Sequence, residues 1–124
     1  MQDGKFTILV IDDTIDVLEL ETTVLGELGY NVIPCNSADE ALAIVAVDAS
    51  LDMVLTDVVL IGDIDGWHLA ERIRELRPNI KVAFTSAYVQ PATLSILTAR
   101  GELFLPKPWK ADALANFMRR TLAS

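Results

Sequence analysis

The run Phe6-Thr7-Ile8-Leu9-Val10-Ile11-Asp12-Asp13 decides the fold of this chain. Residues 6–11 are almost all apolar and rich in β-branched side chains, which is typical of a strand buried on both faces. The run then ends abruptly in two aspartates. Similar apolar runs occur further along the chain, at about residues 31–34, 53–56, 81–85 and 103–105. Buried strands that alternate with helices predict a parallel sheet covered on both sides.

Helical patterns connect these runs. Residues 14–28 place apolar side chains at helical spacing, and Gly29 provides a C-terminal stop. Ser37, followed three residues later by Glu40, forms a capping box before the next helix. Right-handed crossovers between parallel strands leave few topologies. We therefore predict a five-stranded α/β fold, and we expect residues 1–124 to form one domain without linkers or an output domain.

The charge balance argues against several classes of function. The chain of 124 residues has 18 acidic and 10 basic side chains, for a formal net charge of −8. Such a surface does not attract nucleic acid or anionic membranes. Cys35 is the only cysteine, so the chain forms no internal disulfide and no cysteine-based zinc site. Residues 1–5 lack the layout of a signal peptide, and we expect a cytoplasmic location.

Polar side chains gather where the predicted strands end. Asp12 and Asp13 follow the first strand, Asp57 the third and Ser86 the fourth, and Lys107 comes two residues after the fifth. Ligands of open parallel sheets bind at this edge. Three neighbouring carboxylates repel one another, and Mg²⁺ relieves that repulsion because it prefers oxygen ligands. Two other interpretations remain open: the aspartate pair caps the next helix, and Lys107 is a solvated surface charge.

The pattern as a whole resembles the CheY-like receiver domain of two-component response regulators. The matching segments cover nearly the whole chain, in order: Val10-Ile11-Asp12-Asp13, Leu55-Thr56-Asp57-Val58-Val59, Asp65-Gly66, Thr85-Ser86-Ala87 and Lys107-Pro108. The resemblance implies a doubly wound, flavodoxin-like sheet with strand order 2-1-3-4-5. One departure is Ile61, where many receivers have proline, in a loop that is about one residue longer than usual.

The resemblance also implies a chemistry for these residues. Asp57 would accept a phosphoryl group from a phosphohistidine. Mg²⁺, or alternatively Mn²⁺, would be bound by Asp12, Asp13, Asp57 and the backbone carbonyl of Val59. Lys107 and Ser86 would bind the phosphoryl oxygens. Phe104 would rotate inward as Ser86 moves, changing the surface formed by the fourth helix, fifth strand and fifth helix.

The implied partners are a histidine kinase or histidine phosphotransfer protein as donor and a downstream protein as target, with no nucleic acid and no membrane. The chain would be a phosphoacceptor that assists its own phosphorylation and dephosphorylation, without being a separate enzyme. One alternative is a binding module that has the receiver fold but works without phosphorylation. A second alternative is a receiver domain cropped from a hybrid histidine kinase.

Overall fold

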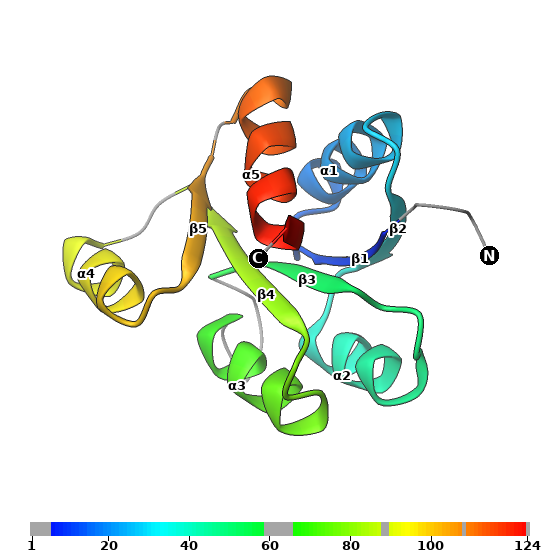
Figure 1. Ribbon diagram of the computed structural model, residues 1–124, viewed down its shortest axis with the longest axis horizontal. Helices are drawn as coiled ribbons and strands as arrows, with labels where there is room; N and C mark the ends of the chain where they lie inside the picture. The colour runs from blue at the N-terminus through cyan, green and yellow to red at the C-terminus, as the bar shows by residue number, and fades with distance from the viewer. Residues whose placement is uncertain (1–5, 59–65, 88–89, 108, 124) are drawn as a thin grey trace.

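The computed structural model describes residues 6–58, 66–87, 90–107 and 109–123. Within these ranges, five strands alternate with five helices along the chain (Figure 1). The strands are β1 (Thr7–Ile11), β2 (Asn31–Cys35), β3 (Met53–Asp57), β4 (Lys81–Ser86) and β5 (Leu103–Pro106). The helices are α1 (Ile15–Glu27), α2 (Ala38–Val47), α3 (Gly66–Leu76), α4 (Pro91–Ala99) and α5 (Ala111–Ala123). The strand bounds differ from the expected ones by no more than one residue at either end.

The strands form one parallel sheet in the order β2-β1-β3-β4-β5, which confirms the predicted fold class. In the register of the sheet, Ile11 pairs with Thr56 and Asp57 pairs with Thr85. The carboxyl ends of β1, β3 and β4 therefore lie beside one another. Pro106 ends β5 at the edge of the sheet, where a missing N–H donor costs no ladder hydrogen bond.

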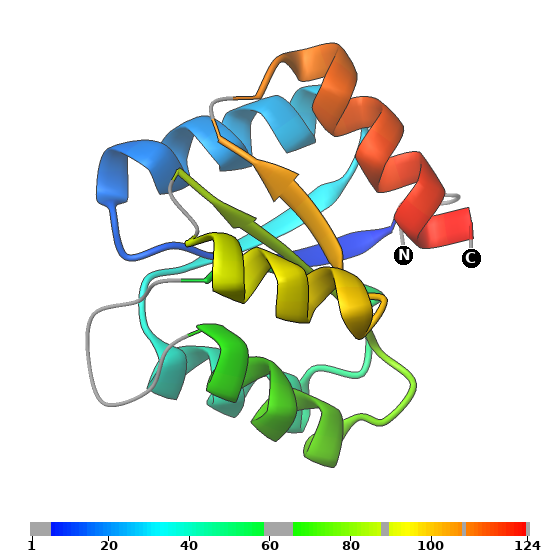
Figure 2. The same cartoon turned by 90° about the vertical axis from the view of Figure 1, so that its left-hand side faces the viewer.

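Helices cover both faces of the sheet, with α1 and α5 on one side and α2, α3 and α4 on the other (Figures 1 and 2). Each strand sends alternate side chains to opposite faces. In β1, Ile8 and Val10 pack toward α1 and α5, whereas Leu9 and Ile11 pack toward the other layer. This alternation divides the buried apolar side chains into two core clusters, one on each side of the sheet.

Local signals account for two of the helix ends. The hydroxyl of Ser37 accepts a hydrogen bond from the backbone N–H of Glu40 at 3.2 Å, as a capping residue does. Gly29, just beyond the end of α1, has a φ of 100°, a conformation that glycine adopts without a steric penalty. No helix in the described ranges has both the length and the apolar character needed to cross a membrane.

Candidate functional site

Residues at or directly after the ends of four strands meet at the carboxyl edge of the sheet. Asp57 is the last residue of β3, and Ser86 is the last residue of β4. Asp12 follows β1 directly, and its backbone N–H donates to the carbonyl of Cys35 at 3.1 Å. Lys107 follows β5, and its backbone N–H donates to the carbonyl of Ser86 at 2.9 Å. These backbone bonds place the predicted site residues at one edge.

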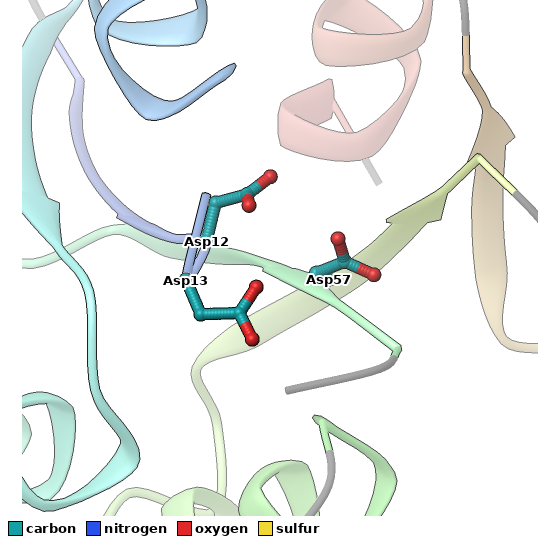
Figure 3. A group of neighbouring side chains, drawn as sticks. All are labelled: Asp12, Asp13 and Asp57. Carbon is teal, nitrogen blue, oxygen red and sulfur yellow. The ribbon is translucent and has the colours of Figure 1, made fainter. Parts of the chain in front are cut away.

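Three carboxylates form an acidic cluster there (Figure 3). Asp12, Asp13 and Asp57 each offer an oxygen, and these oxygens lie within 4.8 Å of one another. Asp12 is fully buried, Asp57 is buried and Asp13 is partly buried. A compact set of carboxylate oxygens suits a hard divalent cation such as Mg²⁺, which keeps several water ligands of its own. The cluster therefore fits a metal, as predicted, whereas Val59 lies outside the described residues.

Lys107 neutralises part of this negative charge. Its Nζ donates to Oδ2 of Asp12 at 2.5 Å and to Oδ2 of Asp57 at 3.1 Å. Burial alone would lower the pKa of Lys107, but the hydrogen bond to Asp12 and the charges of Glu21, Asp57 and Asp12 outweigh burial and raise it. Lys107 is therefore a partly buried member of the cluster and not a solvated surface charge.

Asp12 also closes the turn that precedes the first helix. Its Oδ1 accepts a hydrogen bond from the backbone N–H of Thr14 at 3.0 Å, while the side chain of Thr14 caps nothing. Asp12 therefore supports the turn before α1, but the N–H that it accepts from belongs to the N-cap residue Thr14 and not to the helix that begins at Ile15. The same carboxylate serves both purposes, because its second oxygen, Oδ2, bonds to Lys107.

Gly66 holds the start of α3 against the backbone of Asp57. Its N–H donates to the carbonyl of Val58 at 2.8 Å. A Cβ atom at this position would lie 1.9 Å from the backbone oxygen of Asp57, so every other residue type would push the two segments apart. The sequence predicted a turn at Asp65-Gly66 followed by a helix. The helix α3 does begin at Gly66, Asp65 lies outside the described residues, and the sequence did not reveal the contact of Gly66 with Asp57.

Glu21 is a residue near the site that the motifs did not indicate. It is 1% exposed in α1, and neither carboxyl oxygen has a hydrogen-bond partner among the described residues. Burial, partly opposed by the charge of Lys107, raises the pKa of Glu21 to about 8. The spacing of Glu21 in the sequence could have indicated its burial, because Leu18, Glu21 and Leu25 lie on one face of the helix.

Ser86 and Phe104 occupy the opposite side of the sheet from α1 and α5. Ser86 is buried, and Phe104 is partly buried against the core cluster that includes Phe84, its neighbour in the register of β4 and β5. Both residues therefore lie close to where the motif predicted them. Their roles in phosphoryl binding and switching remain predictions.

The family model described as the response regulator receiver domain matches residues 8–119. The chain belongs to this family. It is therefore a CheY-like receiver of two-component signalling, as the sequence motifs predicted, and the family is not a classical enzyme family. The acidic pocket of this receiver, with Asp12, Asp13, Asp57 and Lys107, is consistent with a phosphoacceptor switch.

Two curated relatives show how the receiver compares with longer proteins. It is 33% identical over 121 residues to the sensor kinase CckA of Brucella abortus (strain 2308), covering 96% of this chain and 13% of that protein. It is 34% identical over 119 residues to the DNA-binding transcriptional regulator NtrC of Azospirillum brasilense, covering 95% of this chain and 24% of that protein. The receiver thus spans about a quarter or less of the length of these relatives.

Solved structures have the same fold. A CheY-like receiver domain protein from Methanospirillum hungatei JF-1 is 25% identical, with a TM-score of 0.85 over 97% of this chain and 95% of that one. The receiver domain of the hybrid histidine kinase CckA is 28% identical, with a TM-score of 0.77 over 94% of this chain and 98% of that one.

Proposed function

We propose that this receiver is a phosphoacceptor switch in which Asp57 accepts a phosphoryl group from a phosphohistidine. The observation that carries the proposal is the position of Asp57 beside the partly buried ammonium of Lys107 and two further carboxylates. A carboxylate that is paired with a lysine and lies beside a potential metal site would have positive charge nearby to offset the negative charge of an incoming phosphoryl group.

In the proposed reaction, a carboxylate oxygen of Asp57 forms a bond to phosphorus while the bond between phosphorus and the imidazole nitrogen of the donor breaks. The product is an acyl phosphate on Asp57, and the donor histidine is released neutral after it takes up a proton. Asp12, Asp13 and Asp57, with the backbone carbonyl of Val59, would hold Mg²⁺ or Mn²⁺. The bound cation supplies positive charge that offsets the negative charge of the phosphoryl oxygens.

Lys107 would supply a second positive charge at the site. Its ammonium already lies 3.1 Å from Asp57 Oδ2, so a modest side-chain movement would bring it to a phosphoryl oxygen on that atom. The hydroxyl of Ser86 would donate a hydrogen bond to another phosphoryl oxygen. Phe104 would then turn into the space that Ser86 leaves, shifting a pre-existing equilibrium between two conformations.

The proposed donor is a histidine kinase or a histidine phosphotransfer protein, and the proposed readout is a protein that binds the surface of α4, β5 and α5. This surface includes exposed apolar side chains, among them Leu94, Ile96 and Leu103. We propose no nucleic-acid or membrane partner for the receiver itself. Residues 1–124 would act as one receiver domain.

Intact-mass measurement after incubation with acetyl phosphate and Mg²⁺ tests the proposal. We expect a gain of one phosphoryl group, about 80 Da, that requires both the metal and Asp57. The Asp57→Asn variant and a metal-free sample are the controls, because each removes one requirement. If a phosphorylated histidine kinase also transfers nothing to the wild-type chain, the protein is instead a binding module that works without phosphorylation.

A further inference from the structure

The first turn of α3 rests directly on the backbone of the predicted phosphoacceptor. Gly66 begins this helix, and a Cβ at Gly66 would lie 1.9 Å from the backbone oxygen of Asp57. The N–H of Gly66 also donates to the carbonyl of Val58 at 2.8 Å. Segments packed this closely leave no gap that could absorb a displacement. A tilt of the first turn of α3 would therefore either press on the backbone of Asp57 or withdraw from it.

The next residue, Trp67, ties that turn to two other parts of the fold. Its ring lies 5.8 Å from the ring of Phe84 in β4, measured between centroids, with an angle of 32° between the ring planes. The guanidinium carbon of Arg100 lies over the Trp67 ring, 4.6 Å from its centroid. At this distance, the positive charge is attracted to the face of the indole ring in a cation–π interaction. Trp67 thus contacts both the sheet and the residue that follows α4.

Arg100 has an anchored backbone and an exposed side chain. Its backbone N–H donates to the carbonyl of Ile96 at 3.0 Å, and the N–H of Glu102 donates to the carbonyl of Leu97 at 2.9 Å. These bonds fix the turn between α4 and β5. The side chain of Arg100 is exposed and can leave the Trp67 ring for water. Both helices lie on the same face of the sheet, so the contact joins α3 to the end of its neighbour α4 (Figure 2).

We propose that Trp67 is a positioning residue for Asp57 and that Arg100 sets its position. While the guanidinium lies on the indole ring, Gly66 stays seated against the backbone of Asp57, and the carboxylate cluster keeps an arrangement that accepts Mg²⁺. When the guanidinium leaves the ring, the first turn of α3 loosens and Mg²⁺ binds less tightly. This inference rests on the proposed function, because the metal site belongs to it. Trp67 and Arg100 act through Gly66 and are assigned no contact with the metal.

The contact couples the end of α4 to the phosphoacceptor. If the contact between Arg100 and Trp67 favours Mg²⁺ binding, then Mg²⁺ binding favours the contact by the same factor. Arg100 directly follows α4, which belongs to the proposed readout surface. A partner that engages the exposed guanidinium through an acidic group therefore weakens the binding of Mg²⁺. This route does not require movement of Ser86 or Phe104.

Magnesium titration of the intact chain by calorimetry tests the inference without any phosphoryl transfer. We expect Arg100→Met to raise the Kd for Mg²⁺ about twofold to fivefold, the size that corresponds to the loss of an exposed cation–π interaction. The sign is diagnostic, because removing a positive charge without this contact would favour a divalent cation and lower the Kd. Arg100→Lys, which keeps the charge, should remain closer to the wild type than Arg100→Met.

Arg74→Gln is the matched control. It also removes one positive charge, and it breaks the ion pair between Arg74 and Glu102, which ties the other end of α3 to the same turn. Because Arg74 lies two helical turns away from Gly66, this variant should not raise the Kd. A rise equal to that of Arg100→Met would show that any loosening of α3 weakens Mg²⁺ binding, and it would overturn the specific role of Trp67.

A double-mutant cycle separates the pair from general effects. In a Trp67→Leu background, Arg100→Met should no longer raise the Kd, because the ring through which Arg100 acts is gone. Trp67→Phe keeps an aromatic face and should have a Kd between those of Trp67→Leu and the wild type. Thermal melting without Mg²⁺ checks that each variant is folded. An Arg100→Met variant with the wild-type Kd, or an equal rise in both backgrounds, would overturn the inference.

Fluorescence provides a readout that is independent of affinity. The chain has two tryptophans, so Trp109→Phe leaves Trp67 as the only one. In this variant, the emission of Trp67 should change as Mg²⁺ saturates the site, and Arg100→Met should reduce that change. Emission that stays constant at saturating Mg²⁺ would overturn the coupling between Trp67 and the metal site.

The outcomes also distinguish the inference from the proposed function. A wild-type chain that binds Mg²⁺ and shows the Trp67-dependent effect of Arg100, yet is never phosphorylated on Asp57, would overturn the proposed function alone. A chain that is phosphorylated normally but whose Mg²⁺ affinity ignores Arg100 would overturn the inference alone. A wild-type chain that binds no Mg²⁺ would overturn both.

Discussion

The Nζ of Lys107 lies 3.1 Å from Oδ2 of Asp57, although 50 positions of sequence separate the two residues. The contact forms because β3 and β5 flank β4 in the sheet and end at the same edge. The backbone of Lys107 is held there by its hydrogen bond to the carbonyl of Ser86. A positive charge is thus built into the site beside the predicted phosphoacceptor, before any phosphoryl group arrives.

Replacing Lys107 with Met should slow the phosphorylation of Asp57. The ammonium is the side-chain cation that contacts Asp57 in the described part of the site, and loss of one such group typically costs a factor of about 10²–10³ in rate. Intact-mass time courses with acetyl phosphate at saturating Mg²⁺ measure this rate. Lys110→Met, which removes an exposed lysine three positions later, serves as the control. Equal rates for Lys107→Met and the wild type would rule out this role.

Gly66→Ala should destabilise the fold and disturb Asp57 together. The added Cβ would meet the backbone oxygen of Asp57 at 1.9 Å, and relieving such a contact costs about 1–3 kcal/mol. Urea unfolding measures the change in the free energy of unfolding, and Mg²⁺ titration measures the change at the site.

Gly26→Ala offers a matched control for that substitution. Gly26 lies in α1, and a Cβ there would meet no atom within 4 Å. Alanine is the better helix former by about 0.5–1 kcal/mol, so this variant should be more stable than the wild type. If both glycine variants changed stability in the same direction, the steric account of Gly66 would be wrong.

The ion pair between Arg74 of α3 and Glu102, just before β5, should stabilise the fold by about 1 kcal/mol or less. The guanidinium donates to both carboxylate oxygens, at 2.9 and 2.7 Å, which is the favourable two-bond geometry. The arginine side chain is 37% exposed, however, so water screens the attraction. A double-mutant cycle with Arg74→Gln and Glu102→Gln, followed by urea unfolding, measures the coupling. A coupling above about 2 kcal/mol would contradict the screening argument.

Cys35 should resist alkylation while the protein is folded. Burial raises the pKa of its thiol to about 12, and the thiol donates to the carbonyl of Ser37 at 3.1 Å. At pH 8 only about one thiol in ten thousand would then be ionised. Iodoacetamide labelling followed by mass should be slow in buffer and fast in urea; fast labelling of the folded chain would contradict the buried, protonated thiol.

The same shift predicts a dependence of stability on pH. The folded-state pKa of Cys35 lies above the ordinary thiol value of 9.0. Its contribution to stability is therefore complete below about pH 9 and is lost as the pH rises toward about 12. Comparing the unfolding free energies of the wild type and Cys35→Ala across this range should show the difference between them shrinking at high pH.

Much of the fold could be predicted because local signals agree along the chain. The apolar run ending at Asp12, the capping box at Ser37 and the glycine at position 29 each act on their immediate neighbours, and each is found where it was expected. The convergence of Asp12, Asp13, Asp57 and Lys107 could be predicted as well, because parallel strands direct their carboxyl ends to one edge. Val59 and the loop with Ile61 lie outside the described residues, so those expectations remain predictions.

By itself, the sequence determined the order of strands and helices, the acidic pair and the residues that end each strand, because these depend on patterns of neighbouring side chains. Only the tertiary structure decided that Lys107 lies nearer to Asp12 than to Asp57, that Gly66 abuts the backbone of Asp57 and that Glu21 is buried. Each of these features depends on how separate helices and strands pack against one another. Packing of helices on the sheet sets their distances, and no local pattern encodes that packing.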